Sequence, residues 1–426
     1  MSKNCAFTIC TKSYIGLALV LKESIYKYYS DLDFYIFVAD EIPAGFELPE
    51  KTFGIKDLNI FDEQKWYEMA FKYNVTEFCT CLKPFMFKWL FENSDAEKIC
   101  YMDPDLYFFD NAEVIYKNLG NCLIELTPHF CTFPENEYSK HFEDEVRFSG
   151  IYNLGFLGLK RHEKSFRLLD WWGNNLTEKC FNDALSFQFT DQKWMDFVTL
   201  LFDLEEINII RDLGWNVAPW NYFERKTVLL DNNYIIEDRN DEKNRTKLLF
   251  CHFSGFDYKK LLQGSVIQKN KGHDNVFPDA DITLNVYIQV LSDKKEKLLS
   301  YFLLSYSYNN FSDGKAIERI HRKIYKSILM NNFENLSNPF ESSGEFYKTI
   351  KRMHIYQEDA KGQIVEILKE NDDYVKNRLK KVNRIMRLLH YVLGHKRYII
   401  LIRFLLRFSK FENQAFLYNK DYLSWV

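Results

Sequence analysis

Long apolar runs are missing from this chain, although 46% of its 426 residues are hydrophobic. No stretch of about 18 uncharged apolar residues occurs, the length that a membrane-spanning helix needs. The apolar segment Cys5–Thr11 near the start is short and is followed directly by Lys12. We therefore expect a buried strand there rather than a secretory leader, and no membrane span.

Paired cysteine motifs are missing as well. The nine cysteines are an odd number, and most of them stand singly in apolar segments. Cys79 and Cys81 are one residue apart, but the sequence contains no pair of C-x-x-C motifs. We expect reduced, buried thiols in a cytoplasmic protein, and neither a disulfide framework nor a zinc site.

An excess of positive charge is lacking, since the formal net charge is -4. This balance argues against a nucleic-acid partner. None of the 16 glycines forms a glycine-rich phosphate loop of the Walker or Rossmann type. The G-x-S-x-G turn of α/β-hydrolases is absent too, which removes the usual signal for that class of enzyme.

Strand-like and helix-like segments do alternate through the first part of the chain. Cys5–Thr11, Phe34–Ala39 and Lys98–Met102 are typical of strands, whereas Tyr14–Tyr29 and Leu82–Glu92 have helical spacing. This order predicts a parallel α/β sheet, in which ligands bind at the carboxyl ends of the strands. Further strands are expected at Cys122–Thr127, Ile151–Leu159, Ile207–Ile210 and Leu248–Phe253, and further helices at Glu163–Glu178 and from about Asp191.

The character of the sequence changes after about residue 260. The polar stretch Asp231–Lys247 before it predicts a surface loop, and helix-prone segments follow it. We expect an α/β domain over residues 1–260 and a mainly helical region over 261–426, with the boundary between 260 and 285. The helix-prone segments are Asp293–Ser307, Ala316–Met330, Phe346–Asn371 and Val375–Phe411.

Two carboxylates follow the strand Lys98–Met102 directly. Asp103 and Asp105, one residue apart at a strand end, can face one divalent cation, and their oxygens suit Mn²⁺ or Mg²⁺. A D-x-D pattern alone also occurs in exposed turns. Here apolar segments flank it on both sides, and a buried pair of charges needs a compensating partner.

A histidine at the end of the last strand-like segment is the third candidate ligand. His252 lies in Phe250–Asp257, and its neutral imidazole can complete a metal site with the acidic pair. Gly255 would let the backbone pass close to a phosphate group. The alternative is a hydrogen-bonded histidine of the core.

Two further charged residues are candidates for contacts with a substrate. Asp191, at a predicted helix start, either caps that helix or faces a sugar, where it can stabilise an oxocarbenium-like transition state. Lys83, at the start of Leu82–Glu92, either meets a diphosphate or lies in solvent. Trp220 within Asn216–Asn221 offers a stacking face between two amides, or it belongs to the core.

Taken in order, these motifs resemble those of the retaining GT-A glycosyltransferases of the glycogenin and bacterial lipooligosaccharide galactosyltransferase type. The resemblance covers residues 3–258 and extends to transferases of bacterial capsule and O-antigen clusters. It implies a GT-A fold, a Rossmann-like nucleotide-diphospho-sugar transferase domain. The matching positions are Thr8, Thr11 and Tyr14 at the nucleotide, Lys83, Asp103 and Asp105, Asn153 in Tyr152–Gly158, Asp191-Gln192 and His252 to Gly255.

The resemblance also implies an activity. A hexose would pass from a nucleoside diphosphate sugar, in the first place a UDP-sugar, to a saccharide or a lipid-linked glycan, with retention of configuration. Asp103, Asp105 and His252 would hold Mn²⁺ or Mg²⁺, Thr8, Thr11, Tyr14, Asp103 and Gly255 would border the nucleotide, and Asp191, Lys83 and Asn153 would serve catalysis. The role would be bacterial surface polysaccharide synthesis. The lysine that follows the His-x-x-Gly turn in glycogenin-like enzymes has no clean match, because Asp257 stands close by.

Two other classes of protein remain open from the sequence. A sugar nucleotidyltransferase also uses paired carboxylates and Mg²⁺, but its glycine-rich basic loop near the N-terminus is absent. A non-catalytic scaffold or carbohydrate-binding protein with a GT-A fold is the other. Intact Asp103, Asp105 and His252 count against the second alternative.

The segment from about 375 to 411 is basic and apolar at once. No acidic residue lies between Asp373 and Glu412. The pattern predicts a basic amphipathic helix or helix pair, broken near Gly394. It either lies on an anionic membrane surface, with the protein peripheral on the inner face of the cytoplasmic membrane, or packs on the catalytic domain.

Overall fold

The computed structural model describes residues 4–135, 137–268, 277–330, 338–353 and 373–417. The chain divides into two compact units, Met1–Tyr308 and Asn309–Val426. The first is a mixed α/β unit around a mostly parallel sheet, and the described part of the second is helical. The predicted fold class is therefore confirmed.

A seven-stranded sheet forms the centre of the first unit, in the order β10-β6-β7-β4-β1-β2-β3. Every neighbouring pair is parallel except β4–β7 and β6–β7, which are antiparallel. The start of β7 therefore lies at the same edge of the sheet as the ends of β4 and β6. The strands are β1 (Asn4–Cys10), β2 (Asp33–Val38), β3 (Thr52–Gly54), β4 (Lys98–Met102), β6 (Ile124–Pro128), β7 (Tyr152–Lys160) and β10 (Ile207–Ile209).

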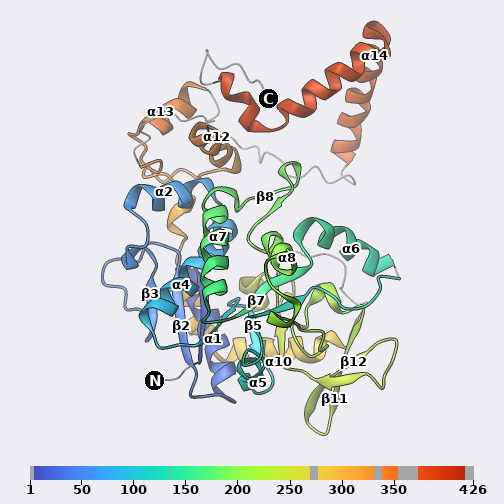
Figure 1. The fold of residues 1–426 in the computed structure, drawn as a ribbon. Helices are drawn as coiled ribbons and strands as arrows, with labels where there is room; N and C mark the ends of the chain where they lie inside the picture. Colours follow the sequence, from blue (N-terminus) through green and yellow to red (C-terminus); the bar gives the residue numbers. More distant parts are fainter. Residues whose placement is uncertain (1–3, 136, 269–276, 331–337, 354–372, 418–426) are drawn as a thin grey trace. The chain divides into compact units, whose positions relative to one another are not determined.

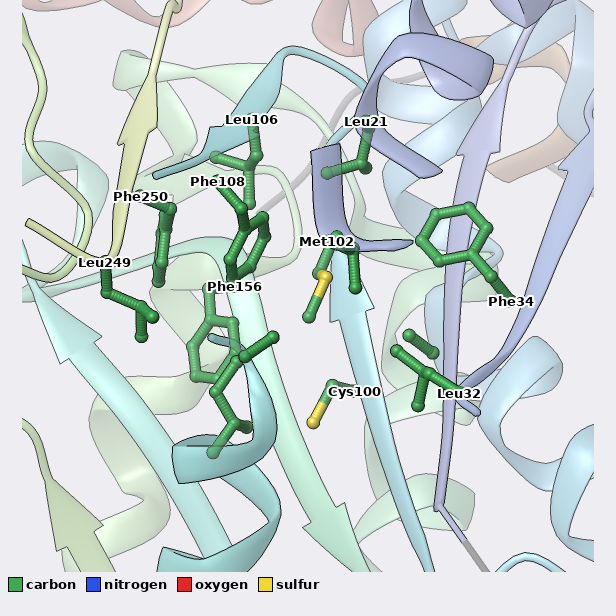
Figure 2. Close-up of a cluster of buried hydrophobic side chains, with 14 of the residues drawn as sticks. Leu21, Leu32, Phe34, Cys100, Met102, Leu106, Phe108, Phe156, Leu249 and Phe250 are labelled. Atoms are coloured by element: carbon green, nitrogen blue, oxygen red, sulfur yellow. The ribbon is translucent and has the colours of Figure 1, made fainter. Parts of the chain in front are cut away.

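Both faces of this sheet are covered, which is why its strands are apolar on both sides. On one face, Cys100 and Met102 of β4 and Phe34 of β2 pack with Leu21 of α1 (Ile15–Tyr26) in a single buried cluster, shown in Figure 2. On the other face, rings of the sheet meet rings of α4 (Lys83–Asn93). The ring centroids of Phe7 and Phe87 are 4.8 Å apart there.

The remaining helices of the first unit surround this sheet (Figure 1). α7 packs against α4, and α11 packs against α1. A Cβ on Gly16 of α1 would lie 2.8 Å from Leu298 Cδ2 of α11, so these two helices approach closely. The helices are α2 (Glu63–Lys72), α3 (Val75–Cys81), α5 (Glu113–Asn118), α6 (Glu137–Ser149), α7 (Glu163–Lys179), α8 (Val198–Leu201), α9 (Tyr258–Leu261), α10 (Ala280–Asp293) and α11 (Lys295–Phe302).

Three small antiparallel sheets complete the first unit. β5 (Leu106–Phe108) pairs with β14 (Phe250–His252), and β8 (Asn182–Asp183) pairs with β9 (Gln188–Phe189). The third sheet contains β11 (Arg225–Leu230), β12 (Asn233–Asp238) and β13 (Arg245–Lys247).

The third of these sheets corrects one expectation. The segment Asp231–Lys247 is not the predicted surface loop, because it contains β12 and β13. Asp231 and Asn232 have φ of 47° and 62° and join β11 to β12 in a two-residue turn. Asp and Asn tolerate this left-handed conformation, which matches the twist of a hairpin. The strands look polar because one face of such a sheet can lie in water.

The second unit contains α12 (Arg319–Met330), α13 (Glu345–Arg352) and α14 (Asp373–Phe408). α14 bends at Gly394, which has φ 70° and ψ 159°, as the sequence predicted. The helix expected over Phe346–Asn371 is described only as α13, and its remainder lies outside the described residues. Within the described residues, no helix combines the length and apolarity that a bilayer crossing requires.

The first compact unit ends at Tyr308, beyond the boundary predicted between 260 and 285. α10 and α11 follow that predicted boundary and pack within the first unit. Trp66 Nε1 donates to Tyr308 Oη at 2.6 Å, and Lys12 Nζ donates to Ser307 Oγ at 2.6 Å. These hydrogen bonds attach the residues up to 308 to the α/β unit.

Candidate functional site

The acidic pair stands at the carboxyl end of β4, where the chain leaves the sheet. The backbone N–H of Asp103 donates to Gly155 O at 2.8 Å, and the hydroxyl of Tyr101 donates to the Asp103 carboxylate. The side chains of Asp103 and Asp105 are 27% and 18% exposed. The pair is therefore anchored from behind and reachable from one side.

His252 reaches this pair through the small sheet of β5 and β14. It lies opposite Leu106, the residue after Asp105, and the N–H of Phe253 donates to Asp105 O at 3.0 Å. His252 Nε2 is 3.2 Å from Asp105 Oδ1 and 3.7 Å from Asp103 Oδ2. Residues about 150 positions apart in sequence thus converge on one point.

The other ring nitrogen of His252 is held by Asn153, at the start of β7. His252 Nδ1 is 3.2 Å from Asn153 Oδ1, and the same oxygen accepts the N–H of Gly155 and the amide of Asn216, each at 3.1 Å. Because Asn153 Oδ1 is an acceptor in these hydrogen bonds, His252 must carry its N–H at Nδ1 to donate to it. The lone pair of a neutral His252 is then at Nε2, directed at the carboxylates, the arrangement that metal-bound histidines use.

Burial and neighbouring charges have opposite effects on the pKa values of Asp103 and His252. Burial raises the pKa of Asp103, whereas the positive charges of Lys83 and His252 act against that rise. Burial by itself would lower the pKa of His252, but Asp105 and Asp103 outweigh it and raise that pKa above its ordinary value. Opposite charges thus stabilise each group in its charged form, and a bound cation would supply such a charge for both carboxylates.

The donor set fits a divalent cation. One ligand atom from each of Asp103, Asp105 and His252 lies within 4.8 Å of the others. Two carboxylate oxygens and one imidazole nitrogen suit Mn²⁺ or Mg²⁺ with positions left for other oxygens. The geometry brings the three predicted metal ligands together.

Lys83 and Asp191 form a buried ion pair beside the acidic site. Their Nζ and Oδ2 atoms are 2.7 Å apart, and both side chains are almost fully buried. Lys83 Nζ also donates to Leu154 O at 2.8 Å and lies 4.2 Å from the centroid of the Tyr101 ring. Lys83 is thus not a solvated surface lysine.

The structure also contradicts the interpretation of Asp191 as a helix cap. The segment after it, Gln192–Phe197, is a 3-10 helix, and the Asp191 side chain makes no capping hydrogen bond to it. Thr190 just before it has φ 39°, a strained value for a β-branched residue. The carboxylate is directed to Lys83 instead of the helix, so the structure does not use Asp191 as a cap.

The Asn216–Asn221 segment packs against His252. The Trp220 and His252 rings are 5.1 Å apart and edge-to-face, and Trp220 is largely buried. Asn221 Oδ1 accepts the N–H of Ala218, and its amide donates to Asn216 O, so this asparagine closes a turn. Of the two interpretations of this segment, these contacts favour the structural one.

The residues expected at the nucleotide lie near the end of β1. Thr8 is buried in the strand, and Thr11 Oγ1 is 2.8 Å from Ser13 Oγ. Burial, followed by the negative charges of Asp105 and Asp257, raises the pKa of Tyr14 to about 12. Gly255 has φ 79°, so a side chain there would be strained.

Sequence reasoning missed a second buried ion pair at this edge of the sheet. Lys12 Nζ is 3.0 Å from Asp40 Oδ1, and both side chains are buried. Asp40 follows β2 as Asp103 follows β4, and that similarity was the available signal. Lys12 alone gives no such signal, because a lysine after a strand is usually solvated.

No family model matches the chain. Two uncharacterized proteins of Bacillus subtilis (strain 168) are similar to it in sequence. YfnF is 25% identical over 252 residues, which cover 58% of this chain and 80% of YfnF. YfnD is 24% identical over 256 residues, which cover 58% of this chain and 76% of YfnD.

Solved glycosyltransferase structures are similar to this chain. One is the galactosyltransferase LgtC in complex with donor and acceptor sugar analogs, with a TM-score of 0.34 and 15% identity, covering 59% of this chain and 87% of LgtC. Another is a glycosyltransferase involved in glycosylation of the major capsid of PBCV-1, with a TM-score of 0.33 and 11% identity, covering 58% of this chain and 92% of that one. The chemistry of the site, rather than these similarities, carries the functional argument.

Proposed function

We propose that this protein is a metal-dependent glycosyltransferase that uses a nucleoside diphosphate sugar. The observation that supports it most is the convergence of Asp103, Asp105 and His252 at the carboxyl end of a central strand. That edge is where α/β sheets bind ligands. A divalent cation held there would offset the charge that develops on a nucleoside diphosphate leaving group.

The chain's own residues would position the donor. Asn153 orients the imidazole of His252, and Lys83 holds the carboxylate of Asp191 in one place. Asp191 then presents a fixed negative charge, which can stabilise positive charge at the anomeric carbon in the transition state. Thr8, Thr11, Tyr14 and Gly255 would border the nucleotide, because they lie around the end of β1 and the turn after β14.

Retention of configuration is part of this proposal. An inverting enzyme needs a carboxylate free to take a proton from the acceptor. The carboxylate of Asp191 is occupied by the Lys83 ammonium group at 2.7 Å, and Asp103 and Asp105 face the cation position, so each is poorly suited to that task. The donor would be a UDP-hexose and the acceptor a saccharide or lipid-linked glycan, in bacterial surface polysaccharide synthesis. Such acceptors place the protein in the cytoplasm, at the inner face of the membrane.

Thermal unfolding tests the site directly. We expect the unfolding temperature to rise with Mn²⁺ plus one of UDP, GDP or CMP, and to stay unchanged with that nucleotide in EDTA. Asp103→Asn and Asp105→Asn should abolish the rise. Asp110→Asn is the matched control, since Asp110 follows β5 outside the cluster and should leave the rise intact.

Donor hydrolysis identifies the reaction. Slow, Mn²⁺-dependent release of free hexose and nucleoside diphosphate from one nucleotide sugar supports the transferase. Formation of a nucleotide sugar from a sugar phosphate and a nucleoside triphosphate would instead identify a nucleotidyltransferase. A protein whose unfolding temperature changes with neither the metal nor a nucleotide would be a scaffold.

A further inference from the structure

Helix α14 exposes apolar and basic side chains over most of its length. Ile385, Leu388 and Val392 are 57%, 62% and 69% exposed, and Phe404 and Leu406 are 56% and 63% exposed. Single exposed apolar residues are common on proteins, but a continuous series marks an interaction surface. The exposed basic residues on the same helix are Arg378, Lys380, Lys381, Arg384, Arg387, Lys396, Arg397 and Arg403.

The first half of α14, up to the bend, is amphipathic. Leu379, Val382, Met386, Leu389 and Leu393 recur at spacings of three and four residues, so they share one side of the helix. Lys380, Arg384 and Arg387 share the other side, at the same spacings. A helix of this kind has one side suited to lipid and one suited to water and anionic groups.

The second half, after Gly394, carries a narrower basic stripe. Lys396, Arg403 and Arg407 are spaced by seven and four residues, which aligns them along the helix. Most of the remaining surface is apolar. Figure 1 shows the two halves as helical arms that meet at a bend, which His390 Nε2 and His395 Nδ1, 3.2 Å apart, span.

Charge distinguishes this segment from the rest of the chain. Eleven lysine and arginine residues, and no aspartate or glutamate, lie between Asp373 and Glu412, although the whole chain has a net charge of -4. A second copy of α14 would be repelled by this charge. A nucleic acid would meet the basic stripes but would leave the apolar sides in water.

We propose that α14 binds the surface of a membrane that contains anionic lipids. Both halves lie in the plane of the interface, with their apolar sides among the acyl chains and their basic stripes at the phosphate groups. Because α14 bends at Gly394, its two halves can be rotated differently about their helix axes. The apolar sides of both halves can then face the same surface. This inference does not rest on the transferase reaction, because vesicle binding tests it without any sugar substrate.

The test is sedimentation of the full-length protein with lipid vesicles. Binding is expected with phosphatidylcholine vesicles that contain phosphatidylglycerol, and not with phosphatidylcholine alone. Raising the ionic strength should weaken it at least about tenfold, because screening shortens the reach of the basic residues. The metal-dependent rise in unfolding temperature should be the same with and without vesicles.

Matched variants locate the surface. Lys396→Gln, Arg397→Gln and Arg403→Gln together should abolish binding, as should Leu379→Gln with Val382→Gln, two residues on the apolar side that are 43% and 48% exposed. Lys117→Gln, Lys140→Gln and Lys243→Gln, which remove the same charge from exposed sites in the first unit, should leave binding unchanged. Helix content by circular dichroism shows whether each variant keeps its fold.

Three results would overturn the inference. One is vesicle binding by the α14 variants that equals binding by the parent. Another is an oligomer in light scattering that the α14 variants dissociate, since a second copy would then cover the helix. The third is retention on a nucleic acid without any binding to anionic vesicles.

Discussion

Gly155 shows how closely single residues define the site. Its carbonyl anchors Asp103, its N–H donates to Asn153, and its missing side chain makes room for His252. A Cβ on this residue would lie 2.6 Å from His252 Nδ1 and 2.9 Å from Asn153 Oδ1. A side chain at this position would displace the imidazole of His252. The site therefore explains why a glycine stands in the middle of this strand.

Gly155→Ala should therefore weaken metal binding. We expect the dissociation constant for Mn²⁺ to rise about 10- to 100-fold, as for other changes to groups that orient a metal ligand. Titration calorimetry measures this value. Gly158→Ala in the same strand is the control, since its Cβ would meet Leu119 Cδ1 at 2.9 Å and should lower only the unfolding temperature. Equal losses of metal affinity in both variants would contradict the role of Gly155.

At the scale of elements, β7 and the β5–β14 pair assemble the site. β7 runs against its neighbours, so its first residues, including Asn153, reach the edge where β4 ends. β14 pairs with β5 and brings His252 beside the acidic pair. Strand positions were predictable from apolar segments and their flanking residues. Strand direction and pairing were not, because both depend on contacts between distant segments.

Strand β6 carries a carboxylate into the sheet interior. Glu125 is fully buried, with Oε1 accepting from Asn208 Nδ2 at 2.8 Å. Burial raises its pKa to about 8 from the ordinary 4.5, against the effect of the amide hydrogen bonds. The neutral acid is therefore the form that this strand accommodates at neutral pH.

The expected consequence is a loss of stability in alkali. A pKa raised by folding contributes stability that is complete below pH 4.5 and is lost as the pH rises through about 8. Glu125→Gln stays neutral and keeps an acceptor for Asn208. The variant should match the parent near pH 5 and exceed it near pH 9 by on the order of 4 kcal/mol in unfolding free energy.

Urea denaturation of the parent and Glu125→Gln across this pH range measures that difference. Because other groups titrate in both proteins, the quantity that matters is the gap between the two curves. A gap that stays constant from pH 5 to pH 9 would show that Glu125 is ionised in the folded protein.

At the scale of the whole molecule, the two compact units raise the question of which part binds substrate. All candidate metal and nucleotide residues lie before Tyr308. α11 packs on α1, and Lys12, which contacts Asp40, also donates to Ser307. Residues 261–308 therefore support the strands that carry the site. A domain that ended at the predicted boundary would lack this support.

Truncation decides between the two boundaries. We expect residues 1–308 to fold and to keep the metal- and nucleotide-dependent rise in unfolding temperature. A chain that ends at residue 260 should lose both, since it exposes the apolar side of α1 that α11 covers. Cooperative unfolding of the shorter chain, with the same ligand response, would instead support the boundary near 260.

The sequence by itself was enough to determine the mixed α/β class, the central strand before Asp103, the helical second part and the bend at Gly394. Each of these features depends on a local pattern: the period of the apolar residues, carboxylates at the end of a strand, or one residue that favours a left-handed backbone conformation. Only the tertiary structure decided that Lys83 pairs with Asp191, that Asn153 orients His252 and that the polar segment 231–247 holds strands. These depend on burial and strand pairing between distant segments, which local sequence does not specify.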